Sequence, residues 1–134
     1  MKPVTIIDDD YMTVWYHIED KILHHKFKKF TSGSHLRDNM LKAAEIFRDR
    51  GACKWLSDDR ENSAIPSEDR AWGDQYWLPI VLKAGWKYWA MVLPRKIVGQ
   101  MNMKRIIDAY AKLGLTTQIF SDPETAMGWL KNQS

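Results

Sequence analysis

Apolar and polar positions alternate along the first part of the chain, as expected for strands with one buried face. The three candidate strands are residues 3–8, 12–18 and 21–27. Only Glu19 and Asp20 separate the second candidate from the third, and such a short loop requires an antiparallel hairpin. With those two residues in the loop, His17 faces Ile22 across the hairpin.

This register sorts the hairpin side chains onto two faces. One face carries Val14, Tyr16, Ile18, Leu23, His25 and Phe27, and the other carries Thr13, Trp15, His17, Ile22, His24 and Lys26. We interpret the first face as core. The second is expected to face solvent or a partner.

From Ser34 onward the apolar period changes to that of a helix. Two helices are predicted in the middle of the chain, one from Ser34 to a C-cap at Gly51 and one from about Pro66 to Ala84. A third is predicted over Asn102–Leu113, with residues 95–101 as a loop or an extra turn. The last helix is predicted to begin after an N-cap at Asp122. Strands are predicted from Ala52 to the Asp58 cluster, over 86–93 and over 115–120. Pro79 predicts a kink in the second helix, whose apolar stripe is Trp72, Tyr76, Ile80 and Ala84.

The order of elements predicts an α/β fold. Three strands precede an α-β-α-β-α-β-α series, so we expect a mixed sheet that opens with an antiparallel hairpin and continues as parallel β-α units. Helices should lie mainly on one face. The length of 134 residues and the 45% content of hydrophobic residues fit a single domain, 1–134.

Charge and composition narrow the functional classes. The 20 basic and 17 acidic residues are interspersed and give a net charge of only +3, so nucleic-acid binding is not expected. No run of roughly 18 apolar residues predicts integral membrane association. The single Cys53 excludes an intramolecular disulfide, and no apolar run of signal-peptide length opens the chain, so a cytoplasmic protein is expected.

The stretch from Ala52 to Asp69 is the best-placed polar junction, because α/β folds gather functional groups where parallel strands end. Asp58, Asp59 and Arg60 are candidates to orient a ligand there. The alternative is a solvated loop held by a local ion pair. The full set of candidate ligand- or partner-binding residues is Asp58, Asp59, Arg60, Ser63, Trp72, Tyr76, Trp15 and His24.

Histidine and tryptophan give two further expectations. His17 and His24 are diagonal neighbours on the hairpin, yet no third ligand is obviously placed nearby, so neither a metal nor another cofactor is predicted. Seven Trp exceed what one small domain buries completely, which indicates an interface or an apolar pocket. A homodimer through the Trp15 and His24 face, or through the aromatic second helix, is a reasonable hypothesis.

The order of elements and four segments, KWLSDDR, PSED, KAGWKYWA and PRKIVGQMNMKR, resemble the bacterial SpoIIAA-like family, which is related to STAS and CRAL-TRIO domains. The resemblance covers nearly the whole chain. It implies a mixed sheet wound as successive β-α turns with helices gathered on one side. STAS regulators carry a phosphorylatable serine in an Asp-Ser-Ser-Gly type signature. This chain has Ser57, Ser63 and Ser67 nearby without that signature, so no phosphoswitch is carried over.

These observations favour a non-enzymatic binding or regulatory module. It would bind a protein partner, or a small amphipathic ligand near the loop at 57–70. The alternative is a small enzyme that uses Asp58 or Asp59 as general base on an unknown polar substrate.

Overall fold

The antiparallel part of the sheet comes first in the chain. The computed structural model describes residues 2–134. Strands β1 (Val4–Asp8), β2 (Met12–His17) and β3 (Ile22–Phe27) form an antiparallel meander. His17 pairs with Ile22, which confirms the predicted hairpin register.

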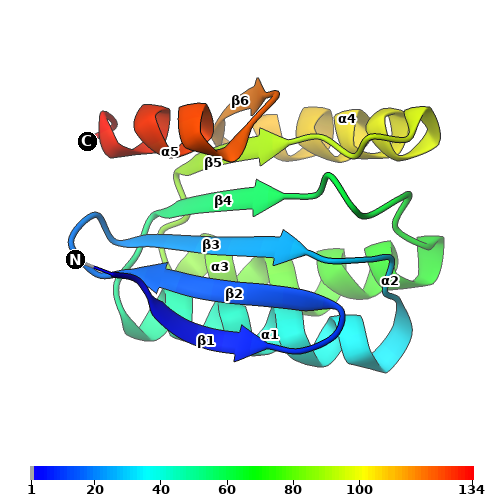
Figure 1. The fold of residues 1–134 in the computed structure, drawn as a ribbon, viewed down its shortest axis with the longest axis horizontal. Coiled ribbons are helices and arrows are strands. Elements are labelled where there is room, and N and C mark those ends of the chain that lie inside the picture. The colour runs from blue at the N-terminus through cyan, green and yellow to red at the C-terminus, as the bar shows by residue number, and fades with distance from the viewer. Residues whose placement is uncertain (1) are drawn as a thin grey trace.

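The parallel half adds β4 (Lys54–Asp58), β5 (Tyr88–Val92) and β6 (Thr116–Phe120). The six strands lie side by side in chain order, as Figure 1 shows. The predicted α/β class, with its mixed sheet and N-terminal hairpin, is therefore confirmed.

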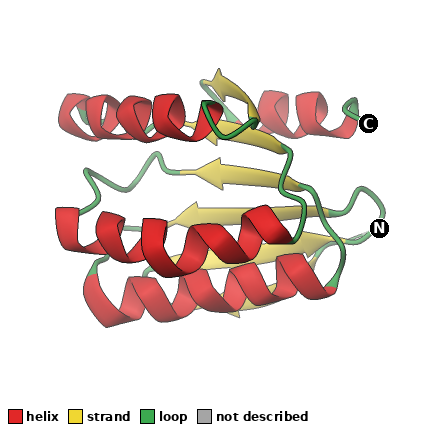
Figure 2. Cartoon of the chain, turned by 180° about the vertical axis from the view of Figure 1, so that it is seen from behind, coloured by secondary structure: helices red, strands yellow, loops and turns green. Residues whose placement is uncertain are grey.

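Three helical segments pack on one face of this sheet and one on the other. The first group is α1 (Gly33–Asp49), the segment α2 (Ser67–Trp72), η1 (Gly73–Trp77) and α3 (Leu78–Lys83), and α4 (Ile97–Ala111). Figure 2 shows this face, with α1 beside α2 to α3, and α4 set apart from them across β4. Helix α5 (Pro123–Lys131) packs against β4 and β5 from the opposite face.

Helix α5 corrects one prediction about the hairpin. Ile22 was expected on a solvent- or partner-facing surface, but it is fully buried with Leu56, Ala126 and Leu130. The second sheet face is thus a small core of its own where α5 covers it. The predicted N-cap explains why α5 begins where it does, since Asp122 Oδ1 accepts a hydrogen bond from the Thr125 backbone N–H at 2.7 Å.

The predicted break in the second helix takes the form of a π-helical turn, η1, just before Pro79. Proline cannot donate a backbone hydrogen bond, and a wider turn removes the need for one. The extra residue also rotates the helix face, so Trp77, Leu78 and Val81 are buried. The predicted stripe is wrong at Tyr76, whose side chain points outward.

Candidate functional site

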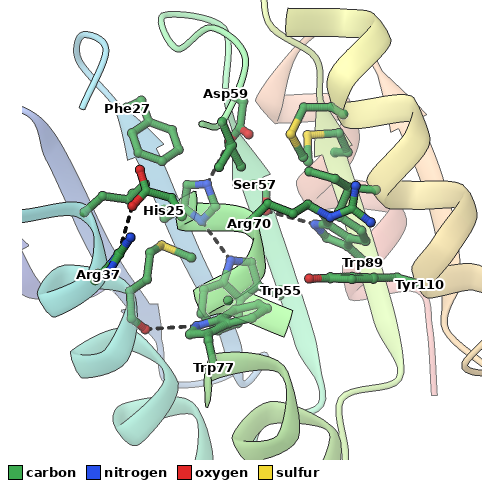
Figure 3. Close-up of a pocket in the computed structure, with 18 of the residues that line it drawn as sticks. His25, Phe27, Arg37, Trp55, Ser57, Asp59, Arg70, Trp77, Trp89 and Tyr110 are labelled. Carbon is green, nitrogen blue, oxygen red and sulfur yellow. Dashed lines mark hydrogen bonds and ion pairs between the residues drawn. The ribbon is translucent and has the colours of Figure 1, made fainter. Parts of the chain in front are cut away.

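A pocket of about 100 Å³ lies between the sheet and the first group of helices. Its floor comes from β3, β4 and β5, and its sides come from α1, the α2 to η1 segment and α4. Figure 3 shows His25 and Asp59 above Trp55, with Arg37 on one side and Arg70 and Tyr110 on the other. The cavity is comparable in size to the ~150 Å³ engineered cavity that takes up benzene.

Aromatic side chains make up a large part of the pocket wall. Trp55, Trp77, Trp86 and Trp89 are buried and touch one another, with ring centroids 5.2 Å apart for Trp86 and Trp89 and 5.3 Å apart for Trp55 and Trp77. Each indole N–H donates within the protein, to His25, to the Met40 and Tyr88 carbonyls, and to Ser57. The walls therefore present ring carbon rather than free donors.

A buried hydrogen-bonded chain runs from Trp55 through His25 to Asp59. Trp55 Nε1 donates to His25 Nδ1 at 2.9 Å, and His25 Nε2 lies 2.7 Å from Asp59 Oδ1. Since Nδ1 must accept, the ring proton belongs on Nε2 and is donated to the carboxylate. His25 is thus a neutral imidazole in one tautomer. His25 and Asp59 are only 4% and 2% exposed.

Ser57 completes the polar floor. It pairs with His25 across β3 and β4, and its Oγ accepts from Trp89 Nε1 at 2.9 Å. No hydrogen bond joins Ser57 to His25 within residues 2–134. Ser57, His25 and Asp59 therefore share a pocket without the wiring of a catalytic triad, because the free lone pair of His25 is already used by Trp55.

Charged groups at the rim are mostly paired. Asp69 accepts from Arg37 Nε at 2.8 Å and from the Gly33 backbone N–H. Arg70 Nε lies 3.4 Å from Asp74 Oδ2 and forms no hydrogen bond to residues 2–134. Asp74 also accepts from Tyr110 Oη at 2.8 Å. Burial, together with this bond, raises the pKa of Tyr110.

The two adjacent aspartates of the predicted cluster separate onto opposite faces of the sheet. Asp59 lines the pocket, whereas Asp58 points away from it and receives two hydrogen bonds from the Arg60 guanidinium, both at 2.9 Å. Burial alone would raise the pKa of Asp58, but the hydrogen bonds from Arg60 outweigh it and lower that pKa. Asp58 and Arg60 thus form the local ion pair of the alternative interpretation.

Of the other predicted residues near the junction, one lines the pocket and two lie outside it. Trp72 lines the pocket. Tyr76 is 55% exposed and lies outside it, because the π-turn rotates this side chain away. Ser63 is not among the lining residues and packs its backbone against Gly99 of α4.

Trp15 and His24 lie on the other face of the sheet, remote from the pocket lining. Their rings contact each other at 4.6 Å, and His17 Nε2 lies 3.2 Å from His24 Nδ1. Burial, with nearby positive charge, lowers the pKa of His24 to about 3. Over residues 2–134, no three His, Cys, Asp or Glu side chains gather as a metal site. The homodimer through this face stays a prediction.

Sequence reasoning missed His25, Ser57 and the roles of Trp55 and Trp89. Strand alternation could have grouped Trp55, Ser57 and Asp59, which are spaced by two residues on one face. What it could not supply was the parallel register that places His25 opposite Ser57. The two strands are connected by a crossover that contains α1, so no short turn fixes their register.

Comparison with protein-family models, curated proteins and solved structures found no match to this chain. The SpoIIAA-like resemblance therefore stays a prediction. Within residues 2–134, no helix has the length and apolar character needed to cross a bilayer.

Proposed function

We propose that this chain is a binding module that takes up a small amphipathic molecule in the aromatic pocket. The observation that carries the proposal is the pocket wall. Four indole rings surround a cavity of about 100 Å³, and their N–H groups are all satisfied inside the protein. Such a wall favours an apolar ligand body, while Asp59 and Ser57 offer polar contacts at one end.

The hydrogen-bond pattern supports binding over catalysis. A general base must reach its substrate with a free lone pair. His25 has none to offer, and Asp58 faces the other side of the sheet. The alternative, a small enzyme, therefore depends on Asp59 alone, whose second oxygen would have to act without an activated nucleophile beside it.

Tryptophan fluorescence tests the proposal directly. We expect a library of single-ring compounds to contain members that change the emission saturably and raise the melting temperature. Met103→Phe adds bulk inside the pocket and should weaken those ligands at least tenfold. Tyr76→Ala, on the exposed side of η1, is the matched control and should leave affinity unchanged. Equal affinity of the Met103→Phe protein and the wild type would place binding elsewhere.

A second candidate function, protein interaction, is favoured by the outer surface of α4. Ile97, Val98 and Met101 are each more than half exposed and lie together on its first turns. Exposed apolar groups of this kind mark interaction surfaces. Light scattering after size exclusion tests self-association. A dimer that Val98→Asp makes monomeric supports the α4 surface, and one that only Trp15→Ala makes monomeric supports the hairpin face. A monomer at all concentrations contradicts both dimers.

A further inference from the structure

We infer that the ligand of the aromatic pocket is a small organic cation, a primary amine carried on a single aromatic ring or an apolar body of similar size. The inference rests on the proposed function and names the chemical class of its ligand. It follows from the charges that line the pocket and from the hydrogen bonds that those charges already make.

Two arginines and two aspartates line the pocket, but one of the aspartates, Asp59, has no arginine or lysine partner within residues 2–134. Arg37 is paired with Asp69, and Arg70 faces Asp74. His25 is neutral because its Nδ1 accepts from Trp55. Asp59 is therefore the carboxylate that no cation neutralises within residues 2–134.

Burial makes a carboxylate without a cationic partner costly. Asp59 is 2% exposed, and its one side-chain partner in the structure is the neutral His25 ring, bound to Oδ1. A buried carboxylate is strongly favoured when an opposite charge and further donors reach it. Oδ2 has no hydrogen bond to residues 2–134, so a ligand ammonium could donate to it at the polar end of the pocket.

The aromatic wall fits the same ligand. Trp55, Trp77, Trp86 and Trp89 present ring carbon to the cavity, which suits an apolar body packed against them. Aromatic faces also attract cations, and the attraction is stronger where water is excluded. The aromatic wall thus favours the ring of an aromatic amine, and Asp59 favours its ammonium group.

Arg70 is the group that would instead favour an anion, since its Nε is buried without a hydrogen bond. Its side chain as a whole is 31% exposed and lies 3.4 Å from Asp74, so its charge is screened by water and partly neutralised. Asp59 is neither exposed to water nor paired with a cation in residues 2–134. The carboxylate therefore dominates the field that a ligand meets inside the pocket.

Three probes on the same ring test the inference: benzylamine, benzyl alcohol and benzoate, titrated into the wild-type protein and followed by tryptophan fluorescence. We expect benzylamine to bind at least tenfold more tightly than benzyl alcohol, and benzoate to bind most weakly. A charge-assisted hydrogen bond of about 1.5–3 kcal/mol corresponds to roughly 10- to 150-fold. Equal binding of amine and alcohol, or tightest binding of benzoate, overturns the inference and leaves the pocket as a binding site. Absence of binding by all three overturns the inference and argues against the proposed function as well.

Two variants locate the effect. Asp59→Asn should reduce the preference for benzylamine over benzyl alcohol to less than twofold. Asp58→Asn is the matched control, because Asp58 is the adjacent carboxylate, is also 2% exposed and faces the other side of the sheet. It should keep the tenfold preference. A preference that survives Asp59→Asn in a folded protein, or is lost in Asp58→Asn, overturns the assignment, and the wild-type probe series decides the question if Asp59→Asn does not fold.

Discussion

The buried hydrogen bonds from Trp55 through His25 to Asp59 lead to a prediction in which a second mutation restores part of the stability that the first one removes. In His25→Leu, the Asp59 carboxylate loses its donor and the Trp55 N–H loses its acceptor. Losing the hydrogen bond to a buried charged carboxylate costs about 1.5–3 kcal/mol, and an orphaned buried N–H costs about 1–3 kcal/mol. The sum is a large part of the ~5–15 kcal/mol by which a domain is stable.

Adding Asp59→Leu to His25→Leu removes the unpaired carboxylate and leaves one orphan, the Trp55 N–H. The double variant should therefore be more stable than His25→Leu, by about 1.5–3 kcal/mol. Asp59→Leu alone should cost about 1–3 kcal/mol, because the His25 N–H then lacks an acceptor.

Urea unfolding at pH 7 and 25 °C, followed by far-UV circular dichroism, measures the four free energies of unfolding. Glu61→Gln is the control, since Glu61 pairs with Arg95 on the exposed surface and should matter by less than about 0.5 kcal/mol. The reasoning is refuted if Asp59→Leu destabilises the His25→Leu protein further, because the carboxylate would then not depend on His25.

Three further predictions concern single positions. The pKa of His24 is lowered to about 3 from 6.5, so its contribution to stability is present above pH 6.5 and is lost as pH falls toward 3. His24→Phe should cut the loss of unfolding free energy between pH 7 and 4 by about 3 kcal/mol, measured by urea unfolding, and parallel pH profiles would contradict this. Asp122→Ala removes the cap on the Thr125 N–H and should lower the melting temperature, with Asp122→Ser restoring most of the loss; an unchanged melting temperature would show that the cap is not needed. Gly99→Ala places a Cβ 2.8 Å from Pro94 Cβ, so it should destabilise the protein by about 1–3 kcal/mol in urea, whereas an unchanged midpoint would mean that α4 shifts freely.

Local patterns in the sequence account for most of the fold. The two-residue periods of β2 and β3, joined by a loop too short for a crossover, determine an antiparallel hairpin. Gly51 adopts a φ of +66° after α1, the conformation that a glycine at this position predicts. Pro79 signals a break in its helix. Each of these signals acts within a few residues of the chain, so no knowledge of distant contacts is needed to interpret it.

The candidate site depends on contacts between distant residues, which the sequence does not encode locally. The adjacent Asp58 and Asp59 look equivalent in sequence, but the strand pleat sends one to Arg60 and the other to His25, 34 positions earlier in the chain. The exposure of Tyr76 follows from the π-turn, which changes the phase of the helix against the sheet, and the sequence signals the break at Pro79 but not this new phase. Local chemistry thus determined the elements and their order. Tertiary packing alone decided which polar groups meet in the pocket, because strand register and helix phase depend on contacts across the whole core.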